Sequence, residues 1–137
     1  MRTFVSLMEE DETNDGVPFT PYATTLAALA TPGEEGATCV RVPMVDVGVP
    51  SREAMTSALD HIDAALAADR PVYVHCFGGI GRTGMVVGCW LLRHGLAAAG
   101  DVVDVLARLR RKDKERVSRR SPETDAQVAF LRAWGRA

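Results

Sequence analysis

Alternating apolar and polar stretches along the chain predict short strands that are separated by amphipathic helices. Strands are expected at 3–7, 38–42 and 72–74, because each run is short, rich in β-branched or aromatic residues, and followed by a loop-forming segment. The run Val72-Tyr73-Val74 opens after Pro71 and has the composition of a central, buried strand.

Helices are expected where apolar residues recur every three or four positions, at 21–29, 51–68, 83–94 and 101–111, and from 121 onward. Ser51 is a good N-cap, and Ser121 followed by Pro122 is typical of the start of a helix. The apolar faces of 83–94 are nearly continuous, which predicts a buried helix. The order of elements predicts an α/β fold with a central, mostly parallel sheet flanked by helices.

The composition narrows the class of protein. Of 137 residues, 47% are hydrophobic and 25% are charged, which is typical of one globular domain. The formal net charge of −2 does not indicate a nucleic-acid partner, and the apolar stretch 85–92 is too short to cross a membrane. Three cysteines and a start without signal-peptide features indicate a reducing, cytoplasmic location.

Positive charge is concentrated in the segment 108–120, which holds 8 of the 16 basic residues and only 2 of the 18 acidic ones. A solvated helix end is the favoured interpretation of this run. The alternative is that part of the run lies at the rim of an active site and steers anionic substrates toward it.

The segment 72–84 carries the candidate chemistry. A strand delivers Cys76 into a loop with glycines at 78, 79 and 81, and Arg82 stands where the next helix begins. Backbone N–H groups of such a loop, together with a helix N-terminus, bind anions, and an arginine fork matches two phosphate oxygens. We expect Cys76 to be a thiolate at neutral pH and a nucleophile toward phosphorus. An inert cysteine in a tight turn is the less favoured interpretation.

The segment His75-Cys76-Phe77-Gly78-Gly79-Ile80-Gly81-Arg82-Thr83-Gly84 resembles the His-Cys-x5-Arg-Thr signature of the cysteine-dependent protein tyrosine phosphatases. It is most similar to their compact dual-specificity and bacterial branch. The segment 43–50 is similar to the one that carries the family's general acid, and 121–127 to the start of its C-terminal helix. The resemblance implies the α/β fold of these phosphatases and a single phosphatase domain over 1–137. Relatives usually have further elements before the first strand, so this chain is expected to be either a minimal form of the domain or one that is truncated at its N-terminus.

The resemblance also implies roles for single residues. Cys76 forms a thiophosphate intermediate, Thr83 hydrogen-bonds the sulfur and helps it to leave, and His75 orients the loop. The phosphate-binding set is Phe77, Gly78, Gly79, Ile80, Gly81 and Arg82. No metal or cofactor is implied, because Arg82 and the loop amides supply the positive charge.

Asp46 is implied to protonate the leaving oxygen and then to activate water. The residues support this role, because Asp46 is a lone carboxylate in an apolar stretch between Pro43 and Pro50, just past a predicted strand. A plain surface aspartate is the alternative, and the acidic cluster 9–12 and Asp15 are judged too mobile to compete. Gln127 is implied to position the water, although a surface position on the helix is equally open.

We therefore predict a phosphomonoester hydrolase, foremost a protein tyrosine or dual-specificity phosphatase, whose partner is a phosphorylated protein or another phosphomonoester. Substrates that stay open are inositol phosphates, phosphoinositides and RNA 5′-phosphates, although the loop 77–81 holds no lysine for additional phosphates. A phospho-binding module and a sulfurtransferase-like or arsenic-handling enzyme are the rivals. The acid loop lacks the tryptophan of the larger tyrosine-specific enzymes, which implies a shallower, less selective site.

The remaining cysteines and histidines have structural interpretations. Cys39 and Cys89 are expected to pack as small apolar residues, with a reversible disulfide to Cys76 as the alternative. His61 and His94 have no metal-like spacing and are expected at the surface or at a helix end. The sequence does not indicate an oligomeric state.

Overall fold

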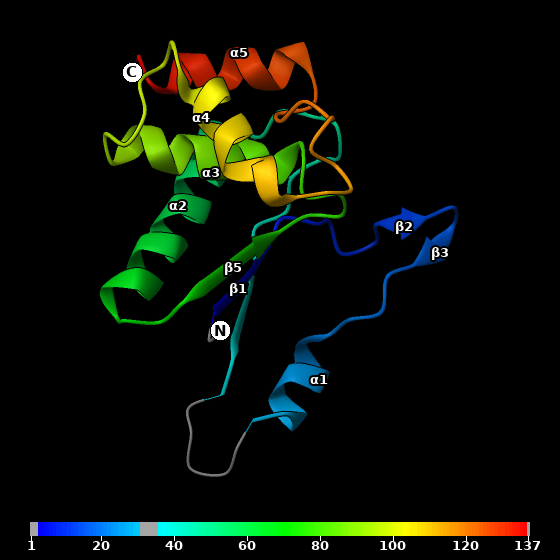
Figure 1. Ribbon diagram of the computed structural model, residues 1–137. Coiled ribbons are helices and arrows are strands. Elements are labelled where there is room, and N and C mark those ends of the chain that lie inside the picture. Colours follow the sequence, from blue (N-terminus) through cyan, green and yellow to red (C-terminus); the bar gives the residue numbers. More distant parts are fainter. Residues whose placement is uncertain (1–2, 31–35, 137) are drawn as a thin grey trace.

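A three-stranded parallel sheet forms the centre of the computed structural model, which describes residues 3–30 and 36–136. Its strands are β1 (Thr3–Ser6), β4 (Thr38–Arg41) and β5 (Val72–His75), in the order β4-β1-β5 (Figure 1). Thr3 of β1 aligns with Thr38 of β4 and with Val72 of β5. The predicted α/β fold with a parallel sheet flanked by helices is confirmed.

The prediction that 72–74 is the central, buried strand is wrong. The central strand is β1, and β5 lies at an edge of the sheet, with Tyr73 47% exposed. Strand side chains alternate between the two faces of a sheet, so Val74 packs into the core with Val5 while Tyr73 points to the opposite face. The apolar run Val-Tyr-Val thus reflects one buried face and one aromatic face, not burial on both.

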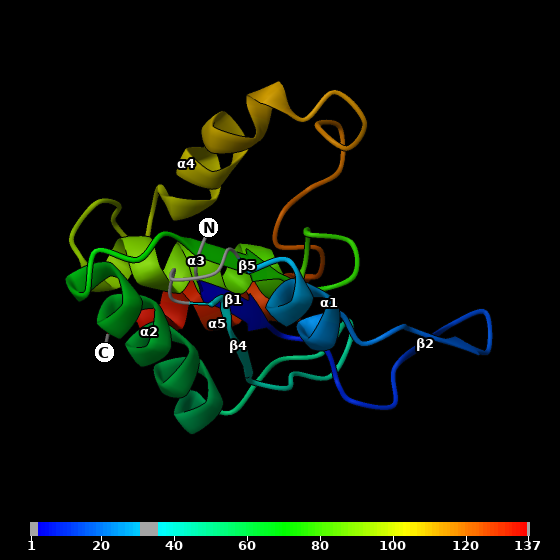
Figure 2. The same ribbon diagram turned by 90° about the horizontal axis from the view of Figure 1, so that it is seen from below.

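Four helices build the main layer against the sheet: α2 (Arg52–Ala67), α3 (Arg82–Arg93), α4 (Val102–Leu109) and α5 (Asp125–Trp134). The helices α2 and α3 pack on the strands, and α4 and α5 pack against α3 (Figures 1 and 2). Ser51 caps α2 as predicted, because its hydroxyl accepts a hydrogen bond from the N–H of Ala54 at 3.1 Å. A short 3-10 turn, η1 (Arg110–Lys112), extends α4.

The start of the last helix differs from the prediction. Thr124, not Ser121, is the N-cap of α5, and it forms a capping box with Gln127. Ser121 is buried and donates its hydroxyl hydrogen to the carbonyl of Ile80 at 2.7 Å. The Thr-x-x-Gln spacing is a capping signal in the sequence, and it outweighs the Ser-Pro pair because Ser121 is used to tie this segment to the loop before α3.

The segment between β1 and β4 reaches the other face of the sheet at Tyr22, whose ring contacts Phe4, while its hairpin projects away from the sheet (Figures 1 and 2). It contains a small hairpin, β2 (Thr13–Asn14) with β3 (Val17–Pro18), and the short helix α1 (Ala23–Ala28). The hairpin turns at Asp15-Gly16, both with positive φ, as an Asp-Gly turn requires. The helix predicted over 21–29 is confirmed; Thr31-Pro32-Gly33, which the sequence predicts to end this helix, lie outside the described residues.

Parallel strands bring their carboxyl ends to the same edge of a sheet, and ligands of α/β proteins bind there. The segments that leave this edge are 7–12 after β1, 42–50 after β4 and 76–81 after β5. Residues far apart in the sequence therefore meet above this edge. No helix within 3–30 or 36–136 has both the length and the apolarity needed to cross a membrane.

Candidate active site

Cys76 lies at the base of the loop that joins β5 to α3. Its side chain is buried, and Sγ accepts hydrogen bonds from the backbone N–H of Gly79 at 3.2 Å and from the Thr83 hydroxyl at 3.0 Å. Gly79 has φ +68°, a backbone conformation that suits glycine and turns its N–H toward the sulfur. Two hydrogen-bond donors therefore converge on the Cys76 sulfur. The structure thus brings Cys76, Gly79 and Thr83 together.

The loop also presents backbone donors. In the part of the chain that the structure describes, no protein acceptor is bonded to the backbone N–H groups of Phe77, Gly78, Ile80 or Gly81. These amides precede the N-terminus of α3, where the helix dipole adds positive potential. Free N–H groups around a nucleophile at a helix N-terminus form a site for an anion with several oxygens.

Arg82 is the first residue of α3, and its side chain is only 1% exposed. Its Nη1 and Nη2 donate to both carboxylate oxygens of Glu12 at 2.6 and 2.7 Å, and Nη2 lies 3.0 Å from Oδ1 of Asp46. Burial opposes the charge of Arg82, but Glu12, Asp46 and the nearby Cys76 together raise its pKa. The Nε of Arg82 is buried and has no hydrogen-bond partner among the described residues.

Glu12 is the residue that the sequence interpretation missed. It was grouped with a cluster judged too mobile, yet its side chain is 13% exposed and clamps Arg82 through two hydrogen bonds. The hydrogen bond from Arg82 lowers the pKa of the Glu12 carboxyl against the opposing effect of its burial. A signal was present, because Glu12 follows β1 and parallel strands deliver their following loops to one edge.

Asp46 lies in the loop after β4, at the mouth of the site. Its side chain is 58% exposed and forms an ion pair with Arg82 across the same edge of the sheet. The next residue, Val47, has φ +60°, which is rare for a β-branched side chain and marks backbone strain. A turn from Val45 to Gly48, with Gly48 N–H donating to the Val45 carbonyl at 3.1 Å, holds this conformation. The loop after β4 thus brings Asp46 to within 3.0 Å of the Arg82 guanidinium, while its role as an acid stays a prediction.

His75, the last residue of β5, is held from two sides. Its Nδ1 lies 3.1 Å from the carbonyl oxygen of Cys76, and its Nε2 is hydrogen-bonded to the hydroxyl of Tyr22. Burial raises the pKa of Tyr22, which keeps its hydroxyl protonated. The two contacts hold the His75 ring beside the backbone of Cys76.

Gln127 is 0% exposed, so the interpretation as plain helix surface is wrong. Its side-chain oxygen accepts from the backbone N–H groups of Glu123 and Thr124, and its Nε2 donates to the carbonyl of Gly48 at 3.0 Å. Gln127 therefore joins the start of α5 to the loop that carries Asp46. Its amide also lies against Gly81, where an added Cβ would come within 3.1 Å of it.

A cavity of about 330 Å³ opens beside Cys76. Its lining includes Cys76, Phe77, Glu9, Phe19 and Arg41. Phe19 and Phe77 contact each other with ring centroids 5.1 Å apart. The cavity therefore offers an aromatic wall next to the sulfur, large enough for part of a substrate's leaving group.

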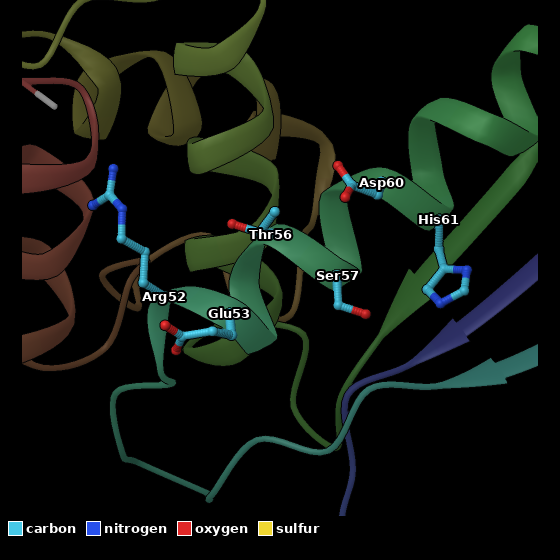
Figure 3. Close-up of a pocket in the computed structure, with 6 residues that line it drawn as sticks. All are labelled: Arg52, Glu53, Thr56, Ser57, Asp60 and His61. Atoms are coloured by element: carbon cyan, nitrogen blue, oxygen red, sulfur yellow. The ribbon is translucent and has the colours of Figure 1, made fainter.

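A second hollow lies on the outer face of α2, away from the edge that carries Cys76. Six side chains of this one helix line it, as Figure 3 shows: Arg52, Glu53, Thr56, Ser57, Asp60 and His61. Its charges have other partners, since Arg52 stacks on the Trp134 ring at 4.4 Å and Asp60 pairs with Arg93 at 2.7 Å. This hollow is an open helix surface and holds no nucleophilic cysteine.

The other cysteines stand apart from Cys76. Cys89 is fully buried in α3, and burial raises its pKa to about 12, so it is unreactive in the folded protein. Cys39 is exposed, which corrects the expected apolar packing. Tyr73 is the β5 residue in register with Cys39, and two strand spacings, roughly 9.6 Å, separate these two residues. Cys76 lies further along the chain than Tyr73, so a disulfide between Cys39 and Cys76 is out of reach. Within the described residues no group of three His, Cys, Asp or Glu is placed to hold a metal ion.

Comparisons with known proteins agree with this geometry. A family model described as "Polymorphic toxin system, DSP-PTPase phosphatase" matches residues 1–96. Uncharacterized protein MJ0215 of Methanocaldococcus jannaschii is 31% identical over 90 residues, which are 66% of this chain and 50% of that protein. Uncharacterized protein MJECL20 of the same organism is 40% identical over 55 residues, 40% of this chain and 37% of that protein. The chain thus spans about half or less of the length of the curated relatives that it matches.

Solved structures show the same fold. Tk-PTP in its active form superimposes with a TM-score of 0.70 at 23% identity, over 98% of this chain and 78% of that one. PTPMT1 in complex with PI(5)P gives a TM-score of 0.71 at 20% identity, over 98% and 76%. DUSP15 gives 0.66 at 17% identity, over 100% and 71%.

Proposed function

Because this chain belongs to the DSP-PTPase phosphatases of polymorphic toxin systems, within the cysteine-dependent protein tyrosine phosphatase superfamily, we propose that it hydrolyses phosphomonoesters on proteins, foremost phosphotyrosine, through a cysteinyl-phosphate intermediate. One domain over 1–137 carries the reaction. The observation that supports this most is the donor set around Cys76: the Thr83 hydroxyl, with the loop amides and the buried Nε–H of Arg82 that have no acceptor among the described residues.

In the first step the Cys76 thiolate attacks phosphorus, a P–S bond forms, and the ester P–O bond breaks. The loop amides of 77–81 and Arg82 Nε hold the non-bridging oxygens and stabilise their charge in the transition state. Asp46 gives its proton to the leaving oxygen. The phosphate competes with Asp46 for Nη2 of Arg82, which frees the carboxyl to face the leaving group.

In the second step Asp46, now a carboxylate, takes a proton from water, and the resulting hydroxide attacks phosphorus. The P–S bond breaks, inorganic phosphate is released, and the Cys76 sulfur leaves as a thiolate that the Thr83 hydroxyl stabilises. Arg82 and the amides supply the positive charge throughout. Gln127 positions Asp46 indirectly, because its Nε2 donates a hydrogen bond to the carbonyl of Gly48, two positions after Asp46.

The test is release of phosphate from an activated aryl phosphate and from a phosphotyrosine peptide, with wild type beside Cys76→Ser. We expect turnover by wild type, no turnover by the variant, and retained binding of inorganic phosphate in calorimetry. Acid quenching of wild type with labelled substrate should trap phosphate on Cys76. Release of phosphate by Cys76→Ser, or trapped label on another residue, contradicts the proposal. Parallel assays with a phosphoinositide and an RNA 5′-phosphate distinguish the substrate classes.

A further inference from the structure

Arg116 connects the basic segment to the phosphate-binding loop. Its Nη1 donates to the carbonyl of Gly78 at 2.9 Å, although the two residues are far apart in the sequence. The segment 113–120 lies next to the loop 76–81 in Figure 1 and apart from it in Figure 2, so the contact between them is the one that the Arg116 side chain makes. The favoured interpretation of the whole run as a solvated helix end therefore does not hold at Arg116.

The backbone that carries Arg116 is fixed by a second arginine. Arg110 donates from Nη1 to the carbonyl of Arg119 at 2.7 Å and from Nη2 to the carbonyl of Arg116 at 3.0 Å. These two hydrogen bonds from the Arg110 guanidinium fix the backbone on both sides of residues 117–118. The backbone of Arg116 is therefore held in one position relative to α4.

The charges of this segment are not equivalent. Arg119 pairs with Glu123, Arg120 pairs with Asp125, and Arg110 lies 3.8 Å from a carboxylate oxygen of Asp113. The guanidinium of Arg116 has no carboxylate within ion-pair distance in the described part of the chain, and its one hydrogen bond is to a neutral carbonyl. Its remaining N–H groups and its full charge are available to an anion.

The position of Arg116 sets the distance at which such an anion would bind. Gly78 follows Cys76 by two positions, so their Cα atoms are at most roughly 7 Å apart. Because Arg116 is bonded to the Gly78 carbonyl, an anionic group bound to Arg116 would lie beside the loop that surrounds Cys76. The side chain of a residue close to the phosphorylated one in a polypeptide substrate is such a group.

The opposite side of the mouth is acidic. Glu9 and Glu10 line the cavity beside Cys76, and Asp11 is exposed next to them, with Arg41 offsetting one of these charges. Figures 1 and 2 both place the loop 76–81 between this acidic segment and the segment 113–120. An anionic bilayer would meet both sides and be repelled by the acidic one, whereas a peptide can place opposite charges on the two sides.

We propose that Arg116 forms a second anionic subsite, which takes an acidic or phosphorylated side chain next to the phosphorylated residue of a polypeptide substrate. This inference rests on the proposed phosphatase function and adds a preference for the order of charges along the substrate. The preferred substrate carries negative charge on the Arg116 side of the phosphorylated residue and neutral or positive charge on the Glu9–Glu10 side.

The experiment compares two phosphotyrosine peptides of identical composition. One has glutamates before and lysines after the phosphotyrosine, and the other has the reverse order. We measure kcat/KM for phosphate release by wild type, and Kd by fluorescence anisotropy with Cys76→Ser. Wild type should prefer one peptide by about fivefold, the size expected for a few exposed charge pairs. Arg116→Ala should remove the preference, Arg116→Lys should keep it, and Arg116→Glu should reverse it.

Arg111→Ala is the matched control, because Arg111 belongs to the same basic segment, is exposed, and makes no bond to the phosphate-binding loop. This variant should keep the preference of wild type. An activated aryl phosphate has no second charge, so Arg116→Ala should lower its turnover no more than it lowers turnover of the less preferred peptide, while the ratio between the two peptides falls to about one. An equal loss on both peptides and on the aryl phosphate would show that Arg116 only supports the loop, and it would overturn the proposal.

The two readouts separate this proposal from the proposed function. Polarised binding without phosphate release would support the subsite and overturn the enzymatic function. Phosphate release at equal rates from both peptides would overturn the subsite and leave the function standing. Faster, Arg116-dependent hydrolysis of a phosphoinositide in vesicles would overturn the assignment to polypeptide substrates.

Discussion

Replacing Glu12 by glutamine tests whether the clamp on Arg82 supports the fold. Arg82 is 1% exposed and Glu12 13%, so the pair is largely removed from water. Breaking a buried pair from one side costs about 3–5 kcal/mol, because the other charge stays buried. Here the introduced amide would keep one acceptor oxygen, and Asp46 and the Met44 carbonyl still contact Arg82. We therefore expect a loss of about 2–3 kcal/mol, or roughly 4 °C in Tm for each kcal/mol.

The pH dependence gives an independent signature of the same pair. Arg82 lowers the pKa of the Glu12 carboxyl in the folded protein below the ordinary value of 4.5. The ionised carboxylate therefore stabilises the fold above the unfolded pKa, and this contribution disappears as the pH falls through the folded pKa. Wild type should lose stability across that acidic window, and the glutamine variant should lack this part of the loss.

The measurement is urea denaturation of wild type, Glu12→Gln and Glu10→Gln at neutral and acidic pH. Glu10 is exposed on the same segment and has no carboxylate bond to Arg82, so its variant should stay within about 0.5 kcal/mol of wild type. Equal stability of the Glu10 and Glu12 variants would refute the reasoning. An unchanged pH profile in Glu12→Gln would refute the assignment of the acidic window to this carboxyl.

Three further predictions concern the same edge of the sheet. Asp46→Asn should lower turnover of a phosphotyrosine peptide by about 10²–10⁴-fold and of an activated aryl phosphate much less; equal losses would remove Asp46 from the acid role. Val47→Gly should relieve the strain of φ +60° and raise the free energy of unfolding by about 1 kcal/mol in urea denaturation, whereas a destabilised variant would contradict that strain. Iodoacetamide at neutral pH should label Cys76, more slowly with inorganic phosphate, and should leave Cys89 unlabelled until the protein unfolds, as peptide mass mapping would show.

Much of the site follows from local sequence. The run from His75 to Gly84 determines a strand, a glycine turn and a helix start, and these alone place Gly79 N–H and the Thr83 hydroxyl on the Cys76 sulfur. Short-range geometry of this kind depends on backbone dihedrals and helix ends, which neighbouring residues fix. The helices α2 and α3 were predictable for the same reason.

Other features depend on which strand lies beside which. Local patterns cannot tell an edge strand from a central one when both are short and apolar, so the position of β1 between β4 and β5 was not predictable from the run 72–74. That order brings Glu12 onto Arg82. The burial of Gln127 likewise depends on the approach of α5 to the loop after β4.

The sequence by itself indicated the glycine turn around Cys76 and the family, because both reside in contiguous residues whose conformation is set locally. The tertiary structure alone decided that a glutamate from the segment after β1 holds Arg82, that Gln127 ties α5 to the Asp46 loop, and that Arg116 reaches the carbonyl of Gly78. The physical reason is that each of these contacts joins segments that only the packing of strands and helices brings within hydrogen-bond distance.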